Sequence, residues 1–418
     1  MRIRSLTWIL AGIMLILDWY VFQAVKTVLH QASPRVKTGI YIFYWLLSAY
    51  ALVLLFFSPW LGLHKWPPLL RQWLVTLVVG LYLAKLLTVV FLLVDDLRRG
   101  LQWIVRLFGK NPPGSDTALP PEIRGITRSQ FMTRAGLLVG GGLFATLAYG
   151  FSNKYNYRVK RHQLHFPNLP PAFRGLKIVQ ISDIHSGSFD HKSRVARGVD
   201  MVLGEQADVI FFTGDLVNNR ADEMKHYQDL FSRIKAPMGV YSTLGNHDYG
   251  DYSQWDSPEA KRRNLEHLKS IHAAMGWRLL MNEHVVLERE GQQIAVIGIE
   301  NWSAKARFPR YGDLKKAYAG AEPFPFKILL SHDPSHWDAQ VRPEYPDIDL
   351  MLAGHTHGMQ FGVEIPGIKW SPIQYMYKEW AGLYNEGRQY LYVNRGYGFL
   401  GYPGRVGILP EITVIELV

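Results

Sequence analysis

Residues 177–185 of this 418-residue chain read Lys-Ile-Val-Gln-Ile-Ser-Asp-Ile-His, a short, mostly apolar run that ends on Asp183 and His185. Short apolar runs of this kind are typical of strands that are buried on both faces of a sheet. Ligands of open α/β sheets gather beyond the carboxyl ends of the strands. The stretch therefore predicts a layered α/β fold with a polar site at one edge of its sheet.

Four further apolar runs end in the same way. They cover residues 209–213, 240–244, 328–330 and 350–353. The side chains that follow them are acidic, amide or imidazole groups: Asp215; Asn246, His247 and Asp248; His332; and His355 and His357. The carboxylates of Asp183 and Asp215, one amide and up to five imidazoles at five strand ends indicate a metal centre.

The segments between these strands complete an alternating pattern. Helices are predicted at residues 192–206, 222–234 and 258–275, and further strands at 292–300, 389–394 and 411–418. Strands that alternate with helices favour sheets covered by helices.

The absence of cysteine narrows the chemistry of the centre. With no cysteine in the chain, thiolate metal sites, disulfides and a cysteine nucleophile are excluded. Aspartate, asparagine and histidine together suit two divalent ions such as Mn, Fe or Zn. Two ions that share a carboxylate, about 3.5–4 Å apart, would clamp the attacking and leaving oxygens of a phosphoryl group. Hydroxide formed from metal-bound water would then be the nucleophile.

The motifs are also specific as a set. Asp-x-His, Gly-Asp, Gly-Asn-His-Asp, a lone His after a strand and Gly-His-x-His occur in this order. Together they resemble the calcineurin-like metallophosphoesterase superfamily, over residues 164–418. Residues 394–396 and 403–412 resemble its branch of membrane-associated bacterial phosphodiesterases. Met359 departs from that branch, which more often has glycine there, and we expect an altered pocket rim.

The resemblance implies a role for each motif residue. The implied metal ligands fall into two sets around one bridging residue: Asp183, His185 and His357 for the first metal, Asn246, His332 and His355 for the second, and Asp215 between them. His247 would contact the phosphate and protonate the leaving oxygen, with Asp248 as its orienting partner. Arg395 would either contact the substrate phosphate or have a structural role near the closing strands.

A basic loop after residue 300 is a second candidate for substrate contact. Lys305, Arg307 and Arg310 lie there, interleaved with Trp302, Phe308 and Tyr311. The loop either binds an anionic headgroup or is solvated surface.

The N-terminal part holds three long apolar segments, at residues 6–29, 40–63 and 73–94. Each is long enough to cross a hydrocarbon core of about 30 Å, which makes residues 1–96 a region of three transmembrane helices. Asp18 and Lys85 lie near the middle of the first and third segments. Because an unpaired charge at mid-bilayer is expensive, we expect these two side chains to pair within a helix bundle.

Residues 97–134 form a basic connector. Its first part, to Phe108, has one apolar helical face and predicts a helix lying on the membrane surface. Residues 112–115, Pro-Pro-Gly-Ser, then break the structure. Residues 135–156 are either a fourth span or a signal anchor, because residues 127–132 weakly resemble a twin-arginine signal whose second arginine is replaced by serine.

The net charge of +11 lies in the N-terminal part. Residues 1–161 hold 19 Lys and Arg against 5 Asp and Glu, whereas the remainder holds 27 against 30. This acidic balance disfavours a nucleic-acid partner for the second part.

The connector carries the largest basic cluster beside any apolar segment, which predicts that it stays in the cytoplasm. The domain of residues 157–418 is then expected outside the cytoplasm.

The sequence thus predicts an integral protein of the inner or plasma membrane, in which a transmembrane helical region precedes a four-layer α/β/β/α sandwich. We expect a metal-dependent hydrolase of phosphoric ester or pyrophosphate bonds, acting on a lipid-linked or nucleotide-activated substrate. By the resemblance, some related bacterial enzymes hydrolyse UDP-diacylglucosamine. The alternative is a non-catalytic membrane scaffold or sensor with a structural metal site. The natural substrate and the oligomeric state stay open.

Overall fold

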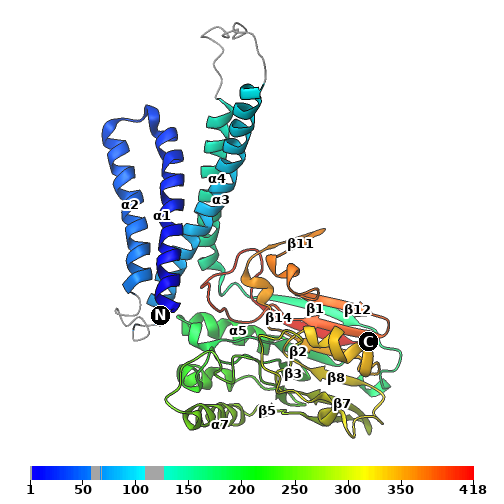
Figure 1. Cartoon of the computed structure of the whole chain (residues 1–418). Helices are drawn as coiled ribbons and strands as arrows, with labels where there is room; N and C mark the ends of the chain where they lie inside the picture. The colour runs from blue at the N-terminus through cyan, green and yellow to red at the C-terminus, as the bar shows by residue number, and fades with distance from the viewer. Residues whose placement is uncertain (1, 58–65, 67, 109–126) are drawn as a thin grey trace. The chain divides into compact units, whose positions relative to one another are not determined.

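The computed structural model describes residues 2–57, 66, 68–108 and 127–418 (Figure 1). The chain divides into two compact units, Met1–Ala148 and Tyr149–Val418. The end of the predicted second span, residues 58–63, and the predicted break at residues 112–115 lie outside the described residues.

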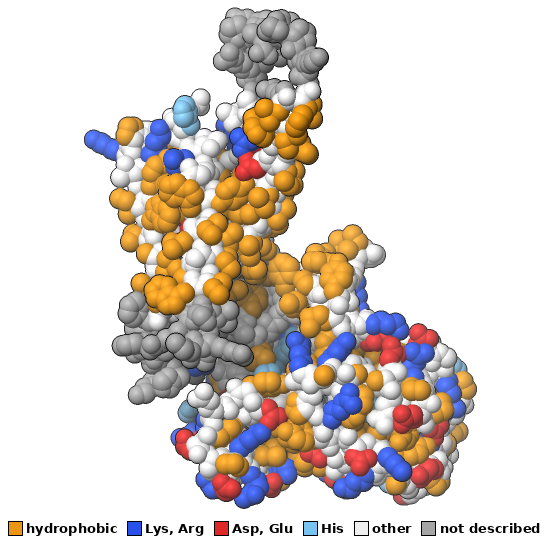
Figure 2. Space-filling view, viewed as in Figure 1, with side chains coloured by type: hydrophobic (Ala, Val, Ile, Leu, Met, Phe, Trp, Pro, Cys, Tyr) orange, Lys and Arg blue, Asp and Glu red, His pale blue; other side chains and the backbone are white. Residues whose placement is uncertain are grey.

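Among the described residues, four helices are long and apolar enough to cross a membrane. They are α1 (Arg2–Val28), α2 (Pro34–Phe57), α3 (Pro68–Phe108) and α4 (Arg128–Gly150). Figure 2 shows apolar side chains over most of the visible face of these helices, as expected of a surface that faces lipid. The helix predicted from residue 97 is the last part of α3, which continues without a break to Phe108, and its position on the membrane surface stays a prediction.

The predicted pair of intramembrane charges is confirmed. Asp18 and Lys85 are both buried, and the Lys85 ammonium donates to the Asp18 carboxylate. Ser48 Oγ accepts a second bond from Lys85 Nζ at 3.1 Å, and the Tyr82 hydroxyl donates to Asp18 Oδ2 at 2.8 Å. This polar cluster joins α1, α2 and α3, since one of its members comes from α1, one from α2 and two from α3.

The second unit, described in full, contains two mixed six-stranded sheets. The strand order of the first sheet is β1 (Arg158–Leu164), β14 (Glu411–Leu417), β2 (Lys177–Ile181), β3 (Val209–Phe212), β4 (Val240–Ser242) and β5 (Arg278–Leu279). The order of the second is β12 (Gly382–Glu386), β13 (Gln389–Val393), β9 (Leu350–Ala353), β8 (Lys327–Leu330), β7 (Gln292–Gly298) and β6 (Glu283–Arg289). In the first sheet, β2, β3, β4 and β5 run parallel to one another. In the second sheet, β13, β9, β8 and β7 do the same.

Alternating side chains build the layers of this unit. On β3, Val209 and Phe211 pack between the two sheets, whereas Ile210 and Phe212 pack on the outer side, against the helices. The outer face of the first sheet is covered by α5 (Lys192–Gly204), α6 (Gln228–Phe231) and α7 (Pro258–Ala274), and that of the second by α8 (Leu314–Tyr318) and the helical turns at 337–344. The predicted four-layer α/β/β/α sandwich is therefore confirmed.

Other parts of the fold differ from the sequence prediction. The helix predicted at 222–234 is split into a 3-10 helix, Ala221–His226, and the short α6. Strand β1 was not predicted, because its residues are mostly polar, and it pairs in parallel with β14 at the edge of the first sheet. A separate two-stranded hairpin, β10 (Val363–Ile365) and β11 (Ile368–Trp370), follows the last motif.

Candidate metal centre

The polar motif residues leave the carboxyl ends of β2, β3, β4, β8 and β9, so both sheets contribute to one site. Five of the seven implied ligands have left-handed backbone conformations: Asp183 (φ 53°), His185 (48°), Asp215 (61°), His355 (71°) and His357 (50°). Such conformations cost about 1–3 kcal/mol each in residues other than glycine, and they cluster at functional sites. The sharp turns that they make direct the side chains of both sheets to one place.

The first group of donor atoms belongs to Asp183, His185 and His357, which all lie within 4.8 Å of one another. His357 Nε2 is 3.2 Å from Asp183 Oδ1 and 3.0 Å from His185 Nε2. All three side chains are buried. Two imidazole nitrogens that face each other at this distance repel unless a proton or a cation lies between them, so the arrangement suits a bound cation.

The second group consists of Asp215, His332 and His355, again within 4.8 Å of one another. His332 Nε2 is 3.1 Å from Asp215 Oδ2, and His185 Nε2 of the first group is 3.5 Å from the same oxygen. Asn246 joins this group, since its Oδ1 is 2.8 Å from His355 Nδ1. The carboxylate of Asp215 therefore lies between the two groups.

Backbone contacts hold these ligands in position. His332 Nδ1 donates to the carbonyl of Thr213 at 2.7 Å, which turns Nε2 toward the site. The backbone N–H of His355 lies 3.0 Å from each oxygen of Asp183. Glycine is required at residues 245 and 354, because a Cβ atom there would lie 2.2 Å from the carboxylate of Asp215 or Asp183, respectively.

The electrostatics favour ionised carboxylates and a neutral His185. Burial raises the pKa of Asp183 and Asp215, but the neighbouring histidines outweigh it and hold both well below the ordinary range. Burial lowers the pKa of His185 to about 3, against the opposing charge of Asp215. For His332, burial is outweighed by Asp215, which raises its pKa to about 10. Positive charge is therefore favoured beside Asp215.

The donor set fits divalent cations. Aspartate, asparagine and neutral histidine, without sulfur, are the ligands of borderline metals such as Mn, Fe and Zn. Among the described residues, Nε2 of His332 is buried without a hydrogen-bond partner, although Asp215 Oδ2 lies 3.1 Å away. A cation between these two atoms would satisfy both.

The structure separates His247 from Asp248. The half-buried His247 donates from Nδ1 to the carbonyl of Asn218 at 2.8 Å, and its ring lines the pocket. The Asp248 carboxylate instead accepts from backbone N–H groups: Asp215 (2.9 Å), Leu216 (2.8 Å), Val217 (3.3 Å) and Gly245 (2.8 Å). The expectation that Asp248 orients His247 is wrong, because the turn after Asn246 directs the Asp248 carboxylate toward the β3 loop.

A cavity of about 190 Å³ opens over the centre. Its other walls come from residues outside the motifs: Arg307, Phe308, Ile373, Tyr377 and Leu400. Arg307 is the member of the basic loop that reaches the cavity, whereas Arg310 donates to the carbonyl of Ser303 at 2.7 Å. Arg307 therefore faces the pocket, whereas Arg310 stabilises the basic loop itself.

Tyr377 was not found from the sequence. Its hydroxyl is 3.0 Å from His355 Nε2 and donates to Asp333 Oδ2 at 3.2 Å. No motif marks this tyrosine, because it follows a short 3-10 helix far along the chain from either partner.

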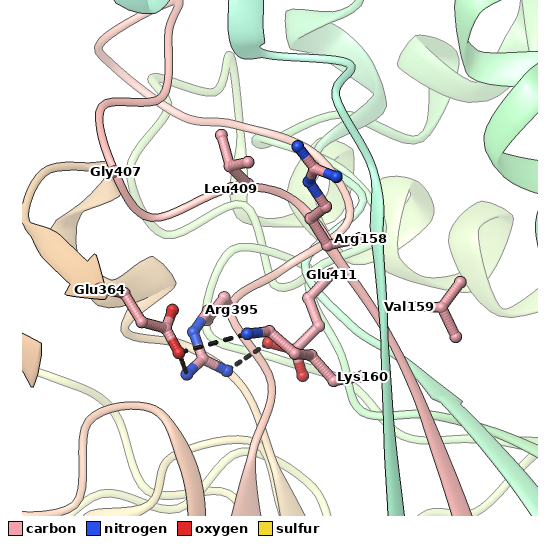
Figure 3. Close-up of a pocket in the computed structure, with 8 residues that line it drawn as sticks. All are labelled: Arg158, Val159, Lys160, Glu364, Arg395, Gly407, Leu409 and Glu411. Carbon is pink, nitrogen blue, oxygen red and sulfur yellow. Dashed lines mark hydrogen bonds and ion pairs between the residues drawn. The ribbon is translucent and has the colours of Figure 1, made fainter. Parts of the chain in front are cut away.

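The sequence left two roles open for Arg395, a contact with the substrate phosphate or a structural role, and its position fits the structural role. It is buried between two carboxylates, 2.8 Å from Glu364 and bonded to Glu411, in the pocket that Figure 3 shows. A second arginine, Arg405, lies in the segment 403–412 that resembles the phosphodiesterase branch, but the sequence analysis assigned it no role. It is fully buried, donates to the carbonyl of Arg395 at 2.7 Å, and lies 3.3 Å from His357 Nδ1.

The backbone conformation of Met359 explains why the phosphodiesterase branch more often has glycine at this position. Its backbone has a φ of 55°, a conformation that glycine adopts without a steric penalty. The side chain is exposed at the surface. The substitution therefore changes the surface next to the last motif and leaves the donor groups in place.

Comparison with known proteins agrees with this geometry. Residues 1–154 match the family described as probable calcineurin-like phosphoesterase, transmembrane domain, and residues 176–359 match the calcineurin-like phosphoesterases. The uncharacterized metallophosphoesterase YkuE of Bacillus subtilis is 31% identical over 303 residues, which are 70% of this chain and 98% of YkuE. The chain belongs to the calcineurin-like phosphoesterase family.

Two further relatives match stretches of this chain that are similar in length to each other. A transmembrane protein with metallophosphoesterase domain from Danio rerio is 33% identical over 258 residues, 60% of this chain and 54% of the relative. The chain thus spans about half the length of that protein. Phosphodiesterase YaeI of Escherichia coli is 27% identical over 266 residues, 63% of this chain and 88% of YaeI. At the level of the family, the predictions of a metal-dependent phosphoester hydrolase and of a membrane protein are confirmed.

Proposed function

We propose that this protein is a membrane-anchored phosphodiesterase or pyrophosphatase with a dinuclear metal centre. The observation that carries the proposal is the position of Asp215. One of its oxygens lies 3.5 Å from His185 Nε2 and 3.1 Å from His332 Nε2, between two groups of donor atoms. A shared carboxylate between two donor groups is the arrangement that a pair of ions requires.

Each group would hold one divalent ion, Mn, Fe or Zn. The ligands would be Asp183, His185 and His357 for the first ion, Asn246, His332 and His355 for the second, and Asp215 for both. When bound, two such cations would supply positive charge to the phosphoryl group and would activate water for in-line attack on phosphorus.

The other pocket residues would position the substrate and move a proton. Because His247 donates to the Asn218 carbonyl through Nδ1, its Nε2 is available to the substrate. His247 would hold a proton beside the leaving oxygen. Arg307 at the cavity wall would bind a non-bridging phosphate oxygen.

A diester or pyrophosphate with an apolar group suits this pocket. Phe308, Ile373 and Leu400 form apolar walls beside the polar centre. The relative YaeI is named a phosphodiesterase, which supports diesters over monoesters. Attachment to a membrane supports a lipid-linked or nucleotide-activated lipid substrate.

We also propose that the catalytic domain, from about residue 157, lies outside the cytoplasm, because the basic connector favours the inner side.

Hydrolysis by the purified full-length chain tests the proposal. After treatment with a chelator and addition of Mn²⁺, the protein should hydrolyse bis(p-nitrophenyl) phosphate. Asp215→Asn should abolish most of the activity, and His247→Ala should reduce it by about 10²–10⁴-fold, the usual contribution of a general acid. Asp222→Asn and His226→Ala, at exposed positions outside the pocket, are matched controls. Metal binding without turnover of any phosphoester would favour the scaffold instead.

A further inference from the structure

The β10–β11 hairpin carries its apolar side chains outward. The strands pair Val363 with Trp370 and Ile365 with Ile368. Because side chains alternate along a strand, these four lie on one face, and all four are exposed, Ile365 and Ile368 each by 55%. We call this set the apolar hairpin face. A hairpin on a soluble surface normally turns such a face toward the core.

The opposite face of the hairpin bonds to the domain. Glu364 and Lys369 pair across it. Glu364 Oε1 lies 2.8 Å from Arg395 Nη2 and 3.4 Å from Lys160 Nζ, and Figure 3 shows these groups turned toward one another. Lys369 donates to the carbonyl of Ala381. These bonds hold the polar face of the hairpin against the domain, so the apolar face points away from it.

The apolar surface continues toward the catalytic pocket. Tyr375 is 77% exposed and Met376 is also exposed, while Trp370 Nε1 lies 3.5 Å from the Tyr375 hydroxyl. Figure 2 shows a cluster of apolar side chains where Figure 1 labels β11. The residues on either side, Ile373 and Tyr377, line the cavity over the metal centre. The surface therefore reaches the rim of the pocket.

Backbone contacts connect the hairpin to the end of the apolar helix α4. The carbonyl of Gly150, the last residue of α4, accepts a bond from the Arg405 N–H at 2.9 Å. The next residue, Val406, pairs with Phe361 and accepts from the Gly362 N–H at 2.9 Å, directly before β10. The hairpin is thus fixed close to the end of a helix that is long and apolar enough to cross a membrane. Trp370 on the hairpin and Tyr375 just after it are of the residue types that favour the membrane interface.

We propose that the apolar hairpin face docks on the lipid surface and brings the pocket rim to the bilayer. An amphipathic phosphoester would then reach the pocket along Tyr375 and Met376 without leaving the membrane. This second step rests on the proposed function, whereas docking itself does not.

Single cysteines test docking, because the chain has none of its own. Val363→Cys and Ile368→Cys would each be labelled with the fluorophore nitrobenzoxadiazole in the full-length chain, reconstituted into phosphatidylcholine–phosphatidylglycerol vesicles. Val286→Cys on β6 is the matched control, since Val286 and Val363 are 40% and 41% exposed. Lipids with doxyl groups should quench the labels at 363 and 368 and leave the label at 286 bright.

Two results would overturn docking on lipid. One is equal quenching at all three positions. The other is self-quenching at 363 and 368 that disappears when labelled chains are diluted with unlabelled ones, which would identify a second copy of the chain as the occupant. Neither readout depends on hydrolysis, so docking is tested even if the proposed function fails.

A kinetic experiment tests the entry route. The double variant Ile365→Asp/Ile368→Asp should lose hydrolysis of a phosphodiester lipid embedded in vesicles and keep hydrolysis of bis(p-nitrophenyl) phosphate. Equal rates for the variant and the unmodified chain on the embedded lipid would overturn the route. An equal loss with both substrates would overturn it as well, because the effect would then not be specific to substrate entry.

Discussion

The carboxylate of Asp248 accepts a hydrogen bond at 2.9 Å from the backbone N–H of Asp215, the residue between the two donor groups. Asp215 has a left-handed backbone with a φ of 61°. The bond therefore holds a strained residue where its side chain faces both groups.

We predict that Asp248→Asn weakens metal binding. The amide nitrogen of asparagine cannot accept the N–H bonds that the carboxylate now accepts, so the Asp215 loop would shift. A supporting residue of this kind typically changes metal affinity by about 10–100-fold. Titration calorimetry with Mn²⁺ measures the change. Unchanged affinity together with a shifted pH profile of hydrolysis would instead indicate that Asp248 acts on His247.

Removing one member of the intramembrane pair should destabilise the helical unit. Lys85→Met leaves the Asp18 carboxylate buried without its cation, and breaking a buried pair typically costs about 3–5 kcal/mol. The double variant Asp18→Leu/Lys85→Leu removes both charges and should lose less. Thermal unfolding of the full-length chain in detergent compares the two. A larger loss in the double variant would contradict the pairing as a source of stability.

The buried His272 should make stability depend on pH. Its Nδ1 lies 3.0 Å from Ser242 Oγ, and burial lowers its pKa to about 3. Because burial depresses the pKa of His272 in the folded state, the stability that neutral His272 contributes is complete above the unfolded pKa of about 6.5. It is lost as the pH falls below that value, by about 1.4 kcal/mol per pH unit. His272→Gln should flatten the slope of unfolding free energy between about pH 5 and 6.5. An unchanged slope would show that His272 is protonated in the folded protein.

The orientation of the chain can be read with reporter fusions. An enzyme active only outside the cytoplasm should be active when fused after Val418 and silent when fused after Phe108, the end of α3. The basic residues that follow α3 favour the cytoplasmic side. The reverse pattern would place the catalytic domain in the cytoplasm.

The strands and the donor residues could be predicted because each is encoded locally. An apolar run such as residues 350–353 forms β9, and His355 follows it directly. The seven implied ligands converge because parallel strands end at one edge of each sheet.

The remaining features depend on contacts between distant segments. Arg405 is buried only because residues 395–398 and His357 surround it. Strand β1 is polar along most of its length, and only its pairing with β14 makes it a strand. The end of α3 was misplaced because the apolar run stops at Asp95 and Asp96, whereas the helix continues to Phe108 with no proline to interrupt it.

The most direct test of the metal centre is the anomalous difference density of Mn²⁺-loaded crystals of the full-length chain. We predict two peaks about 3.5–4 Å apart, the separation of dinuclear phosphoesterase-type sites, on either side of the Asp215 carboxylate. A single peak at Asp215, or peaks away from it, would contradict the account.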